Sequence, residues 1–204
     1  MNPSGRLKFF KKPIISMGAD RSVSDKTVLE EFTESFCRVL VRHCRYIIVS
    51  GFVAIAHGRS RGTEDIDIII ERITKEKFTD LFSDLEKTGF ACVQPGKPED
   101  IYKDYLLENT SIRFVKKGTF VPDMELKLSK DALDDYQLVN RKKLPLTGLD
   151  LYFSSIEANI AFKEEFLKSD KDLEDARHLR IIYSEKLDEA EISKIKDMIK
   201  KRGK

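Results

Sequence analysis

The chain has 204 residues, which is enough for one sizeable hydrophobic core with a small accessory domain. Its 37 basic and 35 acidic residues nearly balance, so the net charge of +2 neither indicates nor excludes a nucleic-acid partner. Three cysteines without C-x-x-C spacing favour reduced thiols in a cytosolic protein over a zinc site or a disulfide framework. Because no apolar run is long enough for a secretory signal or a membrane span, we expect a soluble cytoplasmic protein that does not bind membranes.

The N-terminal half predicts alternating helices and strands. Residues 1–22 are expected to form a leader or an edge segment. Apolar residues then recur at helical spacing in two segments, while short β-branched runs indicate buried strands. The predicted elements, in chain order, are a helix within 22–44, a strand at 45–51, a short helix at 52–58, a strand at 65–71, a helix at 74–89 and a strand at 90–94.

The second half predicts a strand pair followed by helices. Residues 110–128 are typical of two strands joined by a turn at Lys117–Gly118. The weaker strand predictions are 136–146 and 149–154, and helices are expected at 155–168, 172–184 and 188–202. We therefore expect an α/β fold: a mixed sheet flanked by helices in residues 23–153, and a C-terminal helical bundle in 154–204.

Two aspartates begin the most apolar strand of the chain, in the run "DIDIIIE". Alternate residues of a strand share a face, so Asp65 and Asp67 point the same way, about 7 Å apart. Carboxylates this close repel each other unless a cation lies between them. Oxygen ligands in this arrangement suit Mg²⁺ or Mn²⁺, which fill their shells with water and substrate phosphates. A bare D-x-D can also simply mark a solvated strand end.

A candidate phosphate site precedes this acid pair. The run "VSG" ends one strand and begins a short helix fourteen residues earlier, and such a turn presents backbone N–H groups to an anion. A phosphate-binding turn followed by a carboxylate pair is suited to a metal–nucleoside triphosphate.

Two segments resemble a known family. The run "YIIVSGFVAIAHGRSRGTEDIDIIIE" resembles the signature of the nucleotidyltransferase (DNA polymerase β-like) superfamily, in which a Gly-Gly or Gly-Ser turn precedes a D-x-D strand. The run "IEANIAFKEEFLKSDKDLEDARHL" adds a similarity to the minimal branch that includes the AbiEii and MenT toxins. The resemblance covers residues 46–71 and 156–179. Ser50 stands where the first glycine of the turn is expected, which is a departure from the family pattern.

The resemblance implies a role for each matched residue of the first segment. Asp65 and Asp67 would hold the metal ions that bridge the phosphates of a nucleoside triphosphate. Ser50 and Gly51 would bind the distal phosphates. In the loop before the strand, Arg61 and Thr63 are further substrate-binding candidates, although Arg61 could equally be an exposed solubilising charge.

The superfamily also implies a third carboxylate on a neighbouring strand. Asp123 and Glu125 both lie in "VPDMELKL" and share a face; we favour Glu125, because Asp123 follows Pro122 and could lie at a frayed strand start.

The second segment offers a lysine and nearby aspartates. Lys163 would reach the nucleotide phosphates, the alternative being a snorkelling surface lysine. Asp172 could cap the next helix, orient Lys163 or bind substrate, and Asp175 is a weaker candidate.

The resemblance implies a Mg²⁺-dependent nucleotidyltransferase. It would move a nucleoside monophosphate from a triphosphate to an acceptor that the sequence does not identify: tRNA or other RNA, a protein or a small molecule. The alternatives are a catalytically silent nucleotide- or RNA-binding protein of the same fold, or one half of a toxin–antitoxin pair covered by a cognate antitoxin.

Overall fold

Five strands form one mixed sheet within residues 27–63 and 65–202, the part of the chain that the computed structural model describes. The strand order is β1-β2-β5-β4-β3; β2 and β5 run parallel, and the other neighbours are antiparallel. The strands are β1 (Tyr46–Val49), β2 (Asp65–Ile70), β3 (Phe90–Cys92), β4 (Ile112–Lys116) and β5 (Asp123–Leu128). The leader or edge segment expected at 1–22 lies outside the described residues.

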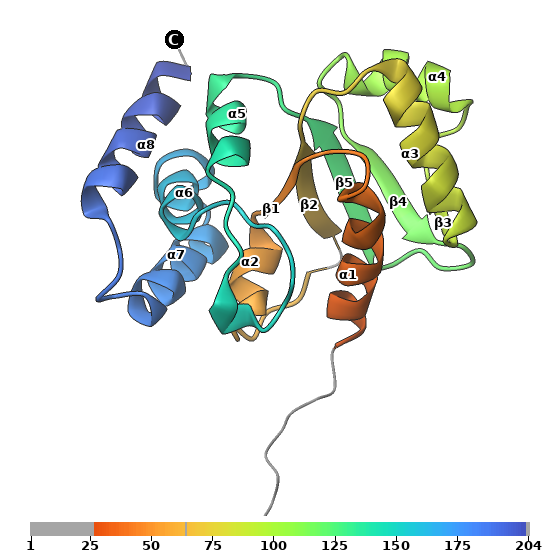
Figure 1. Cartoon of the computed structure of the whole chain (residues 1–204). Coiled ribbons are helices and arrows are strands. Elements are labelled where there is room, and N and C mark those ends of the chain that lie inside the picture. The colour runs from red at the N-terminus through yellow and green to blue at the C-terminus, as the bar shows by residue number, and fades with distance from the viewer. Residues whose placement is uncertain (1–26, 64, 203–204) are drawn as a thin grey trace, which may run out of the picture.

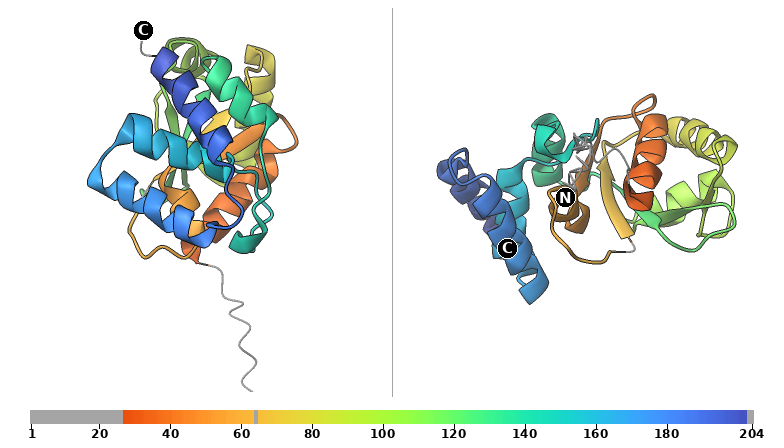
Figure 2. Two further views of the ribbon diagram at one scale, coloured as in Figure 1. Left: turned by 90° about the vertical axis from the view of Figure 1, so that its left-hand side faces the viewer. Right: turned by 90° about the horizontal axis from the view of Figure 1, so that it is seen from below.

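Helices cover both sides of this sheet (Figure 1). Seen from below, α1 and α3 lie on one side, while α6, α7 and α8 lie on the other (Figure 2). The helices are α1 (Val28–Leu40), α2 (Gly51–Ala56), α3 (Lys75–Lys87), α4 (Pro98–Ile101), α5 (Ala132–Val139), α6 (Ile156–Phe162), α7 (Asp170–Ile182) and α8 (Glu189–Arg202). Shorter helical turns are η1 (Tyr102–Leu106), η2 (Pro145–Thr147) and η3 (Lys163–Leu167).

Side-chain caps fix where several helices begin. Thr27 and Glu30 form a reciprocal capping box at α1, and the Ser155 hydroxyl accepts from the backbone of Ala158 at α6. Ser169 caps α7 in the same way, accepting from the Asp172 backbone N–H. The helix predicted at 172–184 therefore begins earlier, and the expectation that Asp172 caps it is wrong.

The two faces of β2 are buried against different partners. Ile66, Ile68 and Ile70 belong to the main core on the α1–α3 side. Ile69 packs instead with Ile47 and with Leu138 of α5 on the opposite face. Because residues alternate along a strand, Asp65 and Asp67 share the face of Ile69. The acid pair therefore lies on the face that carries the C-terminal helices.

The prediction of a strand at 136–146 is wrong. Residues 132–139 form α5 instead, because the Asp131 carboxylate accepts from the backbone N–H groups of Leu133 and Asp134 and so starts a helix. The strand predicted at 149–154 is reduced to isolated bridges, in which Phe153 pairs with Ile48 and Lys142.

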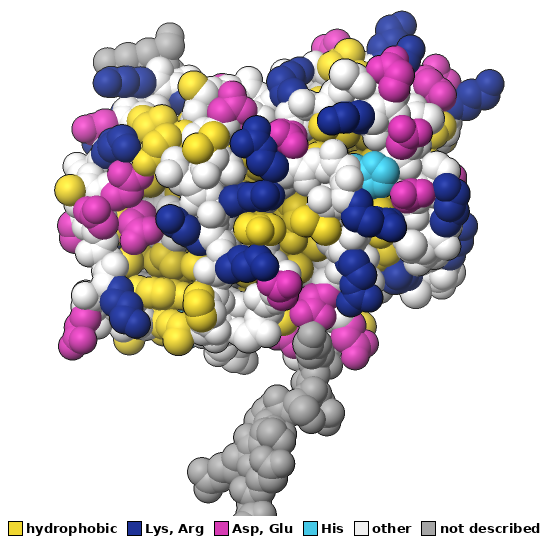
Figure 3. All heavy atoms as spheres, viewed as in Figure 1, with side chains coloured by type: hydrophobic (Ala, Val, Ile, Leu, Met, Phe, Trp, Pro, Cys, Tyr) yellow, Lys and Arg dark blue, Asp and Glu magenta, His cyan; other side chains and the backbone are white. Residues whose placement is uncertain are grey.

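Opposite charges are interspersed over the surface in view. Figure 3 shows lysine and arginine side chains scattered among acidic ones, without a field of a single sign on that face. Among the described residues, no helix is both long and apolar enough to cross a membrane.

Candidate active site

The acid pair lies beside the two candidate third carboxylates. In the parallel register of β2 and β5, Asp65 is paired with Asp123 and Asp67 with Glu125. Asp65 is exposed, and Asp67 is partly buried. The Thr63 hydroxyl donates to Asp65 Oδ1 at 2.9 Å, so this loop residue orients the first carboxylate.

The turn between β1 and α2 has an unusual backbone. Ser50 has φ +66°, a left-handed value that favours glycine. The residue that departs from the family pattern therefore occupies a position where glycine would be unstrained. Such strain at a non-glycine residue is often found at functional sites.

Arg61 lies directly against this turn. A Cβ atom at Gly51 would stand 2.9 Å from Arg61 Nη2, closer than real Cβ contacts allow. Glycine at position 51 thus lets the guanidinium approach the backbone at the start of α2. Because α2 has only six residues, its helix dipole contributes little positive charge at this turn. The positive charge beside the turn therefore comes mainly from Arg61.

These groups surround one open cavity of about 540 Å³, the strand-end cavity. The side chains and backbone that line it come from three segments distant in sequence: Ser50, Gly51, Arg61, Gly62, Thr63, Asp65, Asp67 and Lys171. Two carboxylates and two cations therefore face one volume. All the residues proposed from the first matched segment are brought together here.

The donor set of the strand-end cavity fits Mg²⁺ or Mn²⁺. Among the described residues, no three acidic, histidine or cysteine side chains gather into a ready-made metal cage. Magnesium commonly takes one or two carboxylates and completes its shell with water and substrate phosphates. Asp65 and Asp67 could hold such an ion together with a substrate.

The environment of Asp67 disfavours its charged form. Burial raises the pKa of Asp67 above its ordinary value, and the neighbouring carboxylates of Glu125 and Asp65 add to the rise. Lys127 and a hydrogen bond from Ser50 oppose it but do not outweigh it. A bound cation would reverse this balance, because it favours the carboxylate.

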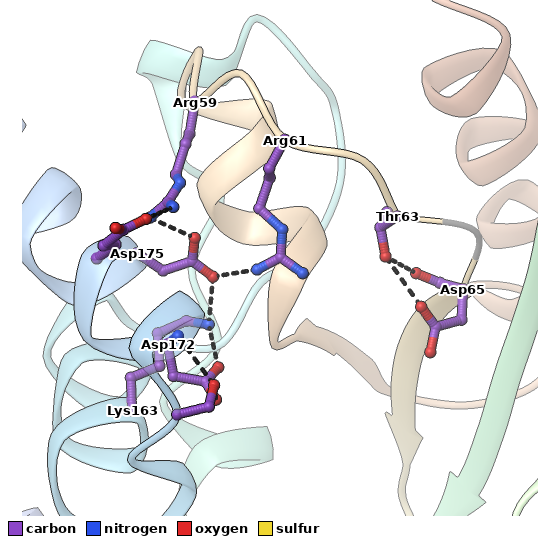
Figure 4. A network of polar contacts seen from close by, with 9 residues as sticks. Arg59, Arg61, Thr63, Asp65, Lys163, Asp172 and Asp175 are labelled. Atoms are coloured by element: carbon purple, nitrogen blue, oxygen red, sulfur yellow. Dashed lines mark hydrogen bonds and ion pairs between the residues drawn. The ribbon is translucent and has the colours of Figure 1, made fainter.

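A buried ion cluster lies on the other side of Arg61 (Figure 4). Asp175 is fully buried and pairs with Lys163 Nζ at 2.8 Å, with Arg59 at 2.9 Å and with Arg61. Lys163 also donates to Asp172 Oδ1 at 3.3 Å. We call these five residues the ion cluster. It ties the loop before β2 to η3 and α7.

Lys163 is not a snorkelling surface lysine. Its side chain is 1% exposed and is held by two aspartates. Burial by itself would raise the pKa of Asp172, but the Ser169 hydroxyl and Lys163 outweigh it and leave that pKa below its ordinary value. Asp172 thus contacts Lys163, and its expected role in orienting this lysine stays a prediction.

Arg113 of β4 faces both candidates for the third carboxylate. Its guanidinium lies 3.3 Å from Glu125 Oε2 and 3.8 Å from Asp123 Oδ2. Asp123 begins β5 and is buried, so it is not frayed as the sequence had indicated. The choice of Glu125 stays a prediction.

Sequence reasoning gave too little weight to some residues. Asp175 was ranked below Asp172, yet it is the centre of the ion cluster; its position one turn after Asp172 on the same helix was the available signal. Arg113 and Lys171 were not singled out. Their positions follow from strand pairing and helix packing, which no local motif reveals.

No protein-family model and no curated protein matches this chain. Among solved structures, the fold is similar to the solution structure of the antibiotic-resistance factor ANT(2'')-Ia, with a TM-score of 0.53 and 12% identity over 85% of this chain and 92% of that chain. An antigenic nucleotidyltransferase-like protein from Paracoccidioides brasiliensis is similar with a TM-score of 0.47 and 17% identity, over 87% of this chain and 90% of that chain. The mixed sheet flanked by helices is thus a nucleotidyltransferase fold, which confirms the predicted fold class.

Proposed function

We propose that this protein is a metal-dependent nucleotidyltransferase. The observation that carries the proposal is the strand-end cavity, in which Asp65 and Asp67 face the same volume as Arg61 and Lys171. Carboxylates that can hold Mg²⁺ and cations that can neutralise phosphate are the two requirements for binding a metal–nucleoside triphosphate. The fold is consistent with this reaction, and the predicted similarity to the AbiEii and MenT branch remains a prediction.

Each residue then has a definite task. Asp65 and Asp67 would hold Mg²⁺, whose charge stabilises the phosphoryl group under attack. Arg61 and the backbone at Ser50–Gly51 bind the outer phosphates, and Thr63 keeps Asp65 oriented. Lys163 keeps Arg61 in place through their shared partner Asp175. Glu125 takes the proton of the acceptor's nucleophile once Arg113 moves aside. The nucleophile then forms a bond to the α-phosphorus, the bond between this phosphorus and the β-phosphate breaks, and pyrophosphate leaves.

A second candidate function is favoured by the position of Arg113. Since this guanidinium pairs with Glu125 and lies near Asp123, a protein in which that contact is permanent would bind nucleotide or RNA without turnover.

Label transfer separates the two functions. The protein is incubated with each α-³²P-labelled triphosphate, Mg²⁺ and total RNA, and label is followed to RNA, to protein and to small products. For the enzyme, we expect transfer to fall by about a thousandfold or more in Asp65→Ala/Asp67→Ala, since metal ions contribute several kcal/mol to such transition states. Asp80→Ala/Asp100→Ala, which removes two exposed carboxylates elsewhere, is the matched control. Triphosphate binding without transfer would support the silent protein instead.

A further inference from the structure

A second cavity borders the strand-end cavity. Its volume is about 170 Å³, and it lies between β1–β2 and the segments α5, α6 and η3. Ser50 and Asp67 line both cavities, so the two volumes meet at these residues. We call this second volume the helix-side cavity. A ligand with phosphates in the strand-end cavity can extend its remaining part into it.

The walls of the helix-side cavity suit a flat ring. Val49 and Ile69 provide an apolar side on the sheet. Phe162 and Phe166 provide an aromatic side, with ring centroids 6.3 Å apart in an edge-to-face arrangement. Aromatic and aliphatic surfaces of this kind stack on planar rings.

Two buried amides line the same cavity, and Ser154 orients both. Gln137 and Asn159 are each 4% exposed. The Ser154 hydroxyl donates to Gln137 Oε1 at 2.8 Å, and Asn159 Nδ2 donates to the backbone oxygens of Ser154 and Ser155. These contacts occupy the side-chain oxygen of Gln137 and the side-chain nitrogen of Asn159.

The opposite ends of both amides remain available. No residue in the described part of the chain accepts a hydrogen bond from Gln137 Nε2, and none donates to Asn159 Oδ1. The cavity therefore offers a fixed donor and a fixed acceptor beside an aromatic wall. Neither atom belongs to the buried side-chain atoms that lack a partner, so both are open to the cavity, where a ligand with a complementary edge would take the place of water.

We propose that the helix-side cavity binds the nucleobase of the nucleoside triphosphate, and that Gln137 and Asn159 determine which base is preferred. A nucleobase is planar and carries hydrogen-bond donors and acceptors along one edge. The inference rests on the proposed function, because it needs the triphosphate to lie in the strand-end cavity. It goes further by assigning base selectivity to two residues that hold neither metal nor phosphate.

Calorimetric titration of the full chain in Mg²⁺ tests the assignment. The ligands are the four nucleoside triphosphates and ribose 5-triphosphate, which lacks a base. We expect one triphosphate to bind best, and the base-free compound to bind about tenfold or more weakly. Gln137→Glu and Asn159→Asp should each change the order of preference and lower affinity for the best ligand by about tenfold to a hundredfold, without changing the affinity for ribose 5-triphosphate.

Asn140→Asp is the matched control, because Asn140 caps α5 outside the cavity and should keep the wild-type order. If the wild type binds ribose 5-triphosphate as tightly as all four triphosphates, the base assignment is overturned and the proposed function survives. That comparison needs no variant, so it stands even where Gln137→Glu or Asn159→Asp fails to fold. If no compound carrying a triphosphate binds, the proposed function itself is overturned.

Discussion

The strand-end cavity and the ion cluster lie on either side of Arg61, and they hold carboxylates in opposite ways. In the ion cluster, Asp175 is fully buried among three cations. In the strand-end cavity, Asp65 is exposed and Asp67 is held in a setting that raises its pKa. The cluster pairs its charges internally, although Asp175 Oδ1 and Arg61 Nε make no hydrogen bond, so it can stabilise the fold. The cavity leaves its acid pair open to a cation, which is what a ligand site requires.

The largest expected effect is the loss of the central carboxylate of the ion cluster. Asp175→Ala leaves Lys163, Arg59 and Arg61 without their shared anion, and removing one partner of a buried ion group typically costs about 3–5 kcal/mol. Urea denaturation should show a loss of this size. Asp170→Ala, an exposed acid in the first turn of the same helix, should cost less than about 1 kcal/mol. Equal losses for the two variants would mean that the cluster does not stabilise the fold.

A smaller effect, on the binding of phosphate, is expected at Arg61, where the strand-end cavity and the ion cluster meet. Gly51→Ala places a methyl group against the Arg61 guanidinium and pushes it away from the turn. Because the side chain is flexible, we expect little loss of stability but about tenfold weaker binding of tripolyphosphate, measured by calorimetry. Ser60→Ala is the control, since Ser60 is an exposed residue of the same loop that does not line the strand-end cavity. If both variants bind as the wild type does, Arg61 does not contact phosphate.

The fold and the acid pair could be predicted because their signals are local. The β-branched run of β2 and its aspartates are read directly from residues 65–70, and the sheet and most helices follow from periodicity. The ion cluster could not be predicted in full, because Arg61 and Asp175 are 114 residues apart in sequence and meet only through the packing of α2 against α7. The helix α5 was missed for another reason: the apolar residues around Leu138 fit a strand, and the Asp131 cap decided the outcome.

Replacing Ser50 should stabilise the protein, whereas the loss of Asp175 should destabilise it. Ser50→Gly relieves the positive φ at this residue, which costs an L-amino acid roughly 1 kcal/mol, so thermal denaturation should show a stabilised protein. The same change removes the hydroxyl that donates to Asp67, and transfer activity should fall. As a control, Ser60→Gly alters an exposed loop residue and should not stabilise the protein. A destabilised Ser50→Gly variant would show that the turn is not strained.

The smallest effect concerns the pH dependence of stability. The pKa of Asp67 is higher in the folded protein than in the unfolded chain, so the folded protein binds more protons between these two values. The free energy of unfolding therefore decreases as pH rises through this interval. Asp67→Asn cannot ionise and should lack this decrease, which leaves it more stable than the wild type above the raised pKa.

Denaturation curves with and without Mg²⁺ distinguish the effect of burying Asp67 from the effect of metal binding. They are measured across this pH range. Because a bound cation favours the carboxylate, Mg²⁺ should stabilise the wild type most at the higher pH and should affect Asp67→Asn much less. Asp80→Asn, at an exposed position on α3, should follow the wild type in both series. If Mg²⁺ stabilises Asp67→Asn as strongly as the wild type, Asp67 does not hold the ion.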